Sequence, residues 1–320
     1  MQLNRFAKFA WFTLLYNLFV ILWGAFVRAT GSGAGCGAHW PTCNGEVIPR
    51  APEVETMIEF FHRVTSGFSL IFIIILFVWA LRTYAKGHHV RKAASFTMFF
   101  IITESLVGAA LVLLELVAYN EAVARVWWMA IHLVNTFLLI GANVLTAWWA
   151  SGGRPFNLRT VNRGKLAMLL IGLVGITLVG TTGAITALGD TLFPVESLVE
   201  GIAQDFDETA HFAVRLRIWH PVLAIAVGFY LMFVAGIAMP DDKTSLTRKF
   251  GMGLFGLVIV QLIAGAVNVL LLAPVWMQIV HLLLADLLWL TLVIFSSELM
   301  AEQPLEADNR SPSMTAAQPS

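Results

Sequence analysis

The sequence predicts an all-α integral membrane protein whose eight transmembrane helices form two repeated four-helix bundles. Of its 320 residues, 58% are hydrophobic and only 12% are charged. Its apolar stretches exceed the roughly 20 residues that cross a bilayer core as a helix. The alternating pattern of a membrane β-barrel is absent from the sequence. Helices are then the structure that satisfies the backbone hydrogen bonds inside lipid.

Eight apolar segments are long enough to span a membrane. Two basic residues, Arg5 and Lys8, flank the start of the first segment. Its apolar run is longer than the h-region of a signal peptide and no small-residue cleavage site stands out, so we expect a retained anchor. The predicted spans are residues 7–27, 58–82, 93–116, 125–150, 166–188, 211–239, 250–272 and 276–299.

Basic residues are divided unequally between the loops of the two sides. With the N-terminus inside, 14 Lys and Arg residues lie on the inner side and six on the outer side. Because cytoplasmic loops carry the basic excess, we expect a multi-pass plasma-membrane protein with both termini in the cytoplasm. Residues 301–320 have too little apolar surface to fold and are predicted to be a disordered cytoplasmic tail. The sequence has no basic groove with interleaved aromatic residues, so nucleic acid is not an expected partner.

Four histidines recur at matched places near the outer ends of the second, fourth, sixth and eighth spans. They are His62, His132, His220 and His281, one pair in each half of the chain. An intramembrane histidine is costly without a partner and is therefore a functional candidate. Two such pairs predict the axial ligands of haem iron, which transfers electrons when two imidazoles saturate it. The alternative is that these histidines form hydrogen bonds between helices as packing groups.

The two halves of the chain resemble each other. The run GAFVRATGSG from Gly24 aligns with GTTGAITALG from Gly180, and LVGAALVLL aligns with IAGAVNVLL. The segments around the histidines align as well, with FFHRVTSGFSLI matching IWHPVLAIAVGF and VWWMAIHLV matching PVWMQIVHLL. Span order and histidine side are preserved, which predicts a parallel repeat. Residues 1–150 and residues 151–300 would then each form a four-helix bundle that holds a cofactor between facing helices. The alternative is chance similarity among apolar helices.

An acidic residue distinguishes the two halves. Glu59 precedes His62 by three residues, so both project from one helical face, whereas Arg217 takes this place in the second half. A carboxylate beside a haem edge could accept a proton or stabilise a developing cation. The alternative is an acidic residue that the helix dipole favours in a first turn. Glu104 and Asp286 are further intramembrane carboxylates, which the sequence leaves without a role.

Cys36 and Cys43 are the two cysteines of the chain, and both lie in the first outer loop. Two cysteines outside the membrane favour a disulfide. Neither belongs to a C-x-x-C-H motif, so covalent attachment of haem is not expected. The pair can staple a glycine-rich loop or have a redox role, and both interpretations stay open.

Two further groups of residues suit a haem site. Small residues let the macrocycle approach helix backbones, and the candidates are Gly67, Gly108, Gly228 and Gly265. Arginines at the outer surface can pair with haem propionates or be ordinary interfacial charges. These arginines are Arg28, Arg63 and Arg215.

Two motifs and the histidine pattern together resemble a known family. The run VRATGSGAGCGAHWPTC from Val27 to Cys43, followed by EFFHR from Glu59, is similar to the haem A synthase family. It is most similar to the bacterial subgroup that has a cysteine pair in this loop. The resemblance covers nearly the whole chain. It implies an oxidoreductase that converts the C8 methyl group of haem O into a formyl group, giving haem A for cytochrome oxidase.

The resemblance also implies roles for single residues. His220 and His281 would hold a resident haem b, His62 and His132 would mark the site where haem O is converted, and Glu59 would be needed for the chemistry. The cysteine pair would act as a redox-active disulfide. One departure is the third span, which reads TESLVGAAL where the family pattern suggests a Gln-Gly type motif.

Two other functions stay open at this point. A b-type cytochrome would pass electrons between a quinol and an outside acceptor, and a haem transporter or chaperone would bind haem as cargo. A carrier usually stacks one haem near each face, whereas all four histidines are predicted near the outer face. The partners expected of a synthase are haem O and haem A, membrane lipid, an external electron acceptor and the haem O synthase that supplies the substrate. An oligomer is compatible with the sequence.

Overall fold

The described part of the chain is entirely helical. The computed structural model describes residues 3–50, 52–156 and 162–301, in which the regular elements are ten α-helices and one short 3-10 helix. Eight helical segments in these ranges are long and apolar enough to cross a membrane, as predicted. The predicted fold class, an all-α membrane protein, is therefore confirmed. The predicted tail falls in residues 302–320, outside the described residues, apart from Ala301, which ends the last helix.

The long helices are α1 Arg5–Ala29, α2 Val54–Thr83, α3 His89–Leu113, α4 Val123–Ala150, α5 Arg163–Leu192, α8 Trp219–Ala238, α9 Leu246–Leu270 and α10 Val275–Ala301. The short helices are η1 Ser32–Ala34, α6 Leu198–Asp205 and α7 Phe212–Arg215.

The predicted sixth span is not one continuous helix. Helix α7 ends at Arg215 and α8 begins at Trp219, with tighter turns between them. Pro221 explains the break, because inside a continuous helix it would lack a donor and its ring would clash with the carbonyl of Arg217. At its actual position Pro221 lies in the first turn of α8, where proline is tolerated.

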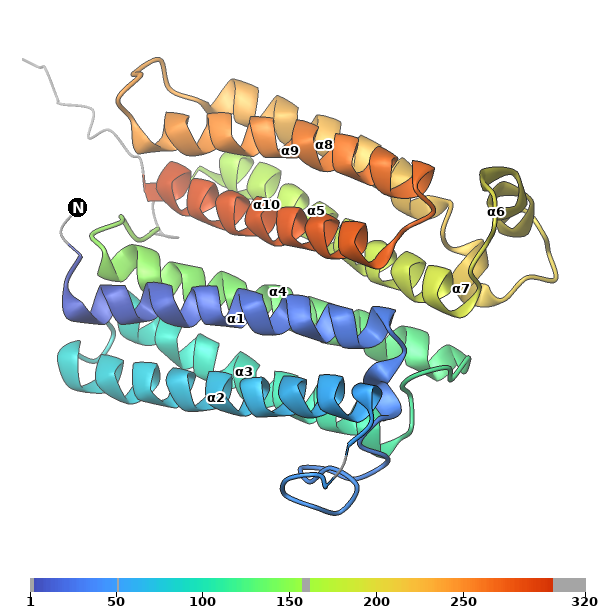
Figure 1. The fold of residues 1–320 in the computed structure, drawn as a ribbon. Helices are drawn as coiled ribbons and strands as arrows, with labels where there is room; N and C mark the ends of the chain where they lie inside the picture. Colours follow the sequence, from blue (N-terminus) through green and yellow to red (C-terminus); the bar gives the residue numbers. More distant parts are fainter. Residues whose placement is uncertain (1–2, 51, 157–161, 302–320) are drawn as a thin grey trace, which may run out of the picture.

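The long helices pack as two groups of four. Helix α1 packs on α2 and α4, and α3 packs on α2 and α4. In the second group α8 and α10 each pack on α5 and α9. Contacts of α4 with α5 and α10 join the groups, which lie side by side (Figure 1). That the groups are repeats of one unit stays a prediction.

One hydrophobic core runs through both groups. It includes Leu14 of α1, Phe137 of α4, Leu169 of α5, Leu231 of α8 and Trp289 of α10. The rings of Phe137 and Trp289 stack with their centroids 5.0 Å apart, and Nε1 of Trp289 donates to the carbonyl of Phe137 at 2.7 Å. The indole therefore packs its apolar surface and satisfies its polar atom at the same seam.

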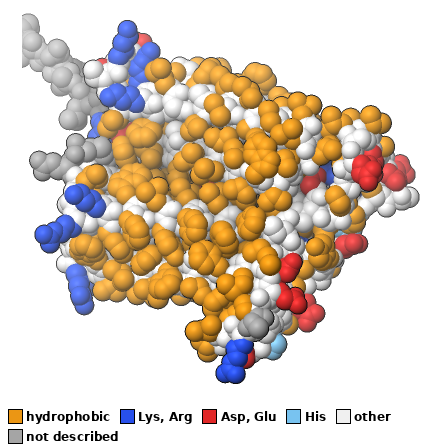
Figure 2. Space-filling model, viewed as in Figure 1, with side chains coloured by type: hydrophobic (Ala, Val, Ile, Leu, Met, Phe, Trp, Pro, Cys, Tyr) orange, Lys and Arg blue, Asp and Glu red, His pale blue; other side chains and the backbone are white. Residues whose placement is uncertain are grey.

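The two ends of the molecule differ in charge. Lys and Arg gather at the end where the chain begins, and Asp and Glu gather at the opposite end (Figure 2). Between them the visible face is mostly hydrophobic, as lipid contact requires. The protein is a multi-pass membrane protein with this charge asymmetry. The side that faces the cytoplasm stays a prediction.

Candidate functional site

The four candidate ligands come together at one end of the molecule. Each lies within the first three turns of its helix: His62 in α2, His132 in α4, His220 in α8 and His281 in α10. These helices all begin at the end opposite the N-terminus, the end that the sequence predicts to face outward (Figure 1). The predicted common depth of the histidines agrees with this arrangement.

The C-terminal pair has the geometry of two ligands facing a common centre. The rings of His220 and His281 have centroids 6.3 Å apart and planes at 89°. With about 2 Å for a metal–imidazole bond and about 1 Å from nitrogen to ring centre, two imidazoles on one metal have centres roughly 6 Å apart. Nδ1 of His220 lies 3.2 Å from the carbonyl of Val179 and 3.3 Å from the hydroxyl of Thr182, which leaves Nε2 for a metal. The pair therefore fits a haem iron.

The N-terminal pair is also close enough to interact. His62 interacts electrostatically with His132 and with Glu104 of α3. Nδ1 of His62 is buried and has no hydrogen bond to a described residue, whereas Nδ1 of His132 lies 3.4 Å from Oε1 of Glu104. Buried polar atoms usually have partners, so the nitrogen of His62 indicates a site that is completed by a ligand. The donor set of this pair also fits a haem iron.

Two of the four glycines that the sequence suggested do lie beside histidines. A Cβ atom at Gly265 would be 3.1 Å from Cε1 of His281, and one at Gly108 would be 4.0 Å from Cε1 of His132. The other two do not contact a histidine, and their proximity to a haem stays a prediction. A Cβ at Gly228 would meet side chains of α9, and one at Gly67 would meet no heavy atom within 4 Å.

The glycines that contact the other two histidines were missed. A Cβ at Gly24 of α1 would be 2.9 Å from Cε1 of His62, and one at Gly183 of α5 would be 2.9 Å from Cε1 of His220. The repeat alignment paired Gly24 with Gly180, which instead faces Phe137. Aligning Gly24 with Gly183, three residues later, would have found both contacts.

Glu59 anchors the loop between α1 and α2 to α2. Its carboxylate accepts a hydrogen bond from the backbone N–H of Cys36 at 2.8 Å and pairs with Nη2 of Arg63 at 2.5 Å. Only 3% of Glu59 is exposed. Arg63 also donates to the carbonyls of Thr42, at 2.6 Å, and of His39. The guanidinium of Arg63 thus binds Glu59 and the loop, and its contact with a haem propionate stays a prediction.

The loop that Glu59 holds contains the cysteine pair. Cys36 and Cys43 form a disulfide. Next to it, Gly35 approaches α2 so closely that a Cβ would lie 2.5 Å from the backbone of Glu55, and its carbonyl accepts from Thr56 Oγ1 at 2.8 Å. The disulfide therefore lies directly on the first turn of the helix that carries His62.

Arg217 anchors the loop that contains α6, in the second half of the chain. Its Nε donates to Asp205 of α6 at 2.8 Å and its Nη1 to Asp190 of α5 at 3.0 Å. Only 7% of Arg217 is exposed. The residue three places before the histidine thus joins loop to helix in both halves, with opposite charge.

Arg28 joins the two helix groups. Its Nη1 donates to the carbonyl of Ala187 at 2.6 Å and to Thr191 at 2.9 Å, and its Nη2 donates to Gln278 at 2.8 Å. These partners belong to α5 and α10. The described partners of Arg28 come from the opposite group, and its contact with a haem propionate stays a prediction. Arg215 is exposed.

The two unplaced carboxylates have different surroundings. Oε1 of Glu104 lies 3.4 Å from Nδ1 of His132, and Oε2 accepts from Nδ2 of Asn135 at 2.6 Å. Thr136 also donates to Glu104. Asp286 is fully buried in α10, and its oxygens have no hydrogen bond to a described residue. The structure therefore brings Glu104, but not Asp286, into the candidate site.

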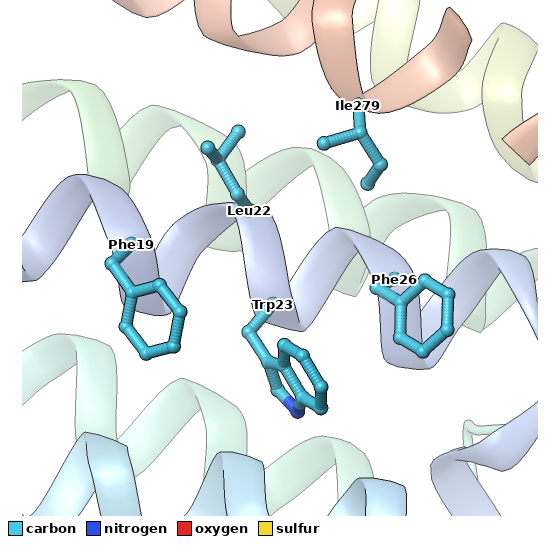
Figure 3. A pocket seen from close by; sticks show the side chains of 5 residues that line it. All are labelled: Phe19, Leu22, Trp23, Phe26 and Ile279. Atoms are coloured by element: carbon cyan, nitrogen blue, oxygen red, sulfur yellow. The ribbon is translucent and has the colours of Figure 1, made fainter. Parts of the chain in front are cut away.

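An apolar groove of about 240 Å³ lies between the two groups (Figure 3). It is lined by Phe19, Leu22, Trp23 and Phe26 of α1 and by Ile279 of α10. No lining residue is titratable, so the groove suits an aliphatic chain and offers no acid–base chemistry.

Known proteins resemble the chain over most of its length. The family described as cytochrome oxidase assembly protein (COX15-CtaA) matches residues 7–293. A heme A synthase of Exiguobacterium sibiricum is 32% identical over 73% of this chain and 74% of its own length. A heme A synthase of Staphylococcus haemolyticus is 27% identical over 87% of this chain and 91% of its own length.

Another relative is a longer protein with a different name. A protoheme IX farnesyltransferase of Thermus thermophilus is 52% identical over 92% of this chain and 48% of its own length. The chain therefore spans about half the length of this relative. The family match and the heme A synthase relatives agree with the fold and with the paired histidines: the chain belongs to the haem A synthase family.

Proposed function

We propose that this protein is a haem A synthase, an oxidoreductase that converts the C8 methyl group of haem O into a formyl group. The observation that carries the proposal is the meeting of two histidine pairs at one end of a membrane protein of this family. With water as the oxygen source, the conversion releases four protons and four electrons. An external electron acceptor takes up these electrons.

The two pairs have different roles in this proposal. His220 and His281 hold a resident haem b, which supplies one-electron transfer when bound. His62 and His132 hold the substrate, haem O. Two imidazoles on one iron would leave no open coordination position, so each histidine pair would limit competing oxygen chemistry there.

Glu59 is the acid–base residue of the N-terminal site in this proposal. It is three residues from His62 on the same helix, and its ionised form can stabilise positive charge that develops at a porphyrin edge. Cys36 and Arg63 fix its carboxylate, so it is oriented before the substrate binds. The cost of ordering a flexible side chain during reaction is thereby avoided.

Haem extraction from membranes tests the proposed function. Membranes that contain the full chain and haem O are expected to yield haem A. His62→Ala should abolish haem A and retain the resident haem b, whereas His220→Ala should remove haem b. Recovery of unchanged haem O with the wild-type chain would support a haem chaperone. A quinol-reducible haem b without haem A would support an electron carrier.

The role of Glu59 has its own test. Glu59→Gln keeps the shape of the side chain and removes its charge, so we expect loss of about 100-fold or more in conversion, as for one general acid–base group. Glu55→Gln, at an exposed position one turn earlier in α2, is the matched control. Full conversion by Glu59→Gln would refute the catalytic role and leave only the loop contact.

We also propose that the protein works beside a haem O synthase, which makes its substrate. The relative of about twice this length is named protoheme IX farnesyltransferase, and the present chain matches nearly half of it. A single chain that joins two haem-modifying units would pass haem O directly between them. Co-purification of this chain with a haem O synthase from membranes tests the association.

A further inference from the structure

We propose that Glu104 is a positioning residue that makes the N-terminal histidine pair electronically different from the C-terminal pair. The inference rests on the proposed function, since it concerns the same N-terminal site. It extends that function by assigning a carboxylate that neither the sequence motifs nor the loop contacts explain. Gln261 takes the corresponding place in the second half.

Glu104 lies on the side of the His132 ring that is opposite the nitrogen available to a metal. Its Oε1 lies 3.4 Å from Nδ1 of His132, which is the ring nitrogen away from Nε2. A movement of about half an ångström converts this contact into an ordinary hydrogen bond. With Nδ1 donating to Glu104, Nε2 carries the lone pair that binds a metal.

A network of side chains holds the carboxylate in this place. Nδ2 of Asn135 donates to Oε2 of Glu104 at 2.6 Å and to the carbonyl of Phe100 at 2.9 Å. Thr103 donates to the amide oxygen of Asn135 at 2.6 Å, and Thr136 donates to Glu104. The amide is thus fixed on both sides, and Glu104 accepts from two donors besides the candidate ligand. A carboxylate present only for packing has no need of such a network.

The second half offers an amide where the first offers a carboxylate. Glu104 and Gln261 each precede by four residues the glycine that contacts the histidine of the neighbouring helix. Nε2 of Gln261 lies 3.4 Å from Nε2 of His281 and donates to its backbone carbonyl at 3.2 Å. The two positions therefore match in sequence, but Gln261 approaches Nε2 of its histidine, whereas Glu104 approaches Nδ1, so a carboxylate at Nδ1 is particular to the N-terminal pair. Their difference is one full charge.

The charge on the carboxylate changes how strongly the neighbouring imidazole donates electrons to a bound metal. A carboxylate behind a ligating histidine raises the basicity of the ligand, and replacing such a partner typically costs 10–100-fold in metal affinity. A more basic ligand stabilises ferric over ferrous iron. A haem iron at the N-terminal site should therefore be more stable in the ferric state with Glu104 than with an amide in this place.

Reciprocal substitutions test the inference on the full chain, loaded with haem in lipid nanodiscs. Glu104→Gln should raise the midpoint potential of one haem and weaken its binding about tenfold or more, leaving the other haem unchanged. Gln261→Glu should lower the potential of the other haem. Redox titration followed by visible absorbance, with resonance Raman spectra of the iron–histidine modes, measures both effects. Glu104→Asp keeps a carboxylate and should restore part of the wild-type potential.

The controls separate this inference from the proposed function. Glu115→Gln, an acidic residue in the loop after α3, should leave both potentials unchanged. If Glu104→Gln binds both haems at wild-type potentials, the inference is overturned while the proposed function stands. If the wild-type chain binds no haem through His62 and His132, the proposed function itself fails. Thermal unfolding of each variant identifies any loss that is due to misfolding.

Discussion

At the scale of single residues, the candidate ligands rest against glycines, and three of these contacts leave no room for a methyl group. A Cβ at Gly24, Gly183 or Gly265 would lie 2.9–3.1 Å from a histidine Cε1, below ordinary van der Waals contact. Close-packed interiors transmit such changes, so the ring positions depend on these glycines. Gly108 leaves more room, with a corresponding distance of 4.0 Å.

We predict that Gly24→Ala displaces the ring of His62 and lowers the conversion of haem O about 100-fold, as expected for a shift of about 1 Å at a reacting centre. Gly183→Ala should instead reduce the content of resident haem b. Haem extraction and chromatography measure both effects. The matched control is Gly67→Ala, which introduces a Cβ with no heavy atom within 4 Å. Equal loss in all three variants would show that the effect is a general helix defect.

The sequence predicted these residues unevenly. The four histidines and their depth in the spans could be predicted, because a polar imidazole inside an apolar segment is recognised from the sequence alone. The glycine contacts depend on the rotation of each helix about its axis, which the sequence does not give. The repeat alignment was shifted by three residues here, so it paired Gly24 with Gly180 and not with Gly183. Glu104 was visible as an intramembrane acid, but its neighbour His132 lies on another helix and could not be assigned from spacing.

At the scale of elements, buried charges hold two of the loops at the end opposite the N-terminus, the loop after α1 and the loop that contains α6. Arg217 pairs with Asp190 and Asp205, whose side chains are 24% and 21% exposed. We predict that Arg217→Ala destabilises the protein by about 2–3 kcal/mol, less than for a fully buried pair because water reaches the acids. The exposed Arg215→Ala is the control. Thermal unfolding in detergent should show a lower midpoint for the first variant only.

The cysteine pair gives a second prediction at this scale. Replacing both Cys36 and Cys43 by Ser removes a short covalent loop and should destabilise the folded loop by about 2 kcal/mol. Because Glu59 and Arg63 still hold the loop, we expect haem O conversion in a single turnover to persist. Hydrogen exchange of the loop and single-turnover conversion measure the two effects. Loss of single-turnover conversion with an intact loop would favour the redox role.

The predicted elements match the observed helices wherever a long apolar run marks the helix in the sequence. The eight predicted spans correspond to the eight observed segments. Helix α6 was not predicted, because an eight-residue helix in an outer loop has no membrane-length signal. The break before Trp219 was missed although Pro221 marks it, since the apolar run continues through the break.

At the scale of the whole molecule, the separation of charge between the two ends predicts the orientation in the membrane. The basic end includes the N-terminus, so a fluorescent protein fused to the C-terminus should fluoresce in the cytoplasm. Alkaline phosphatase fused in the loop that contains α6 should be active outside. An active phosphatase at the C-terminus would reverse the orientation and place the histidines near the cytoplasm.

The stacked pair Phe137 and Trp289 lies in a core to which both helix groups contribute. Neither group can unfold alone without exposing aromatic surface and the carbonyl that Trp289 binds. Two groups that share a core do not unfold separately, so the protein should unfold as one cooperative unit. Either half, made alone, would lack the partner that its own inner face requires.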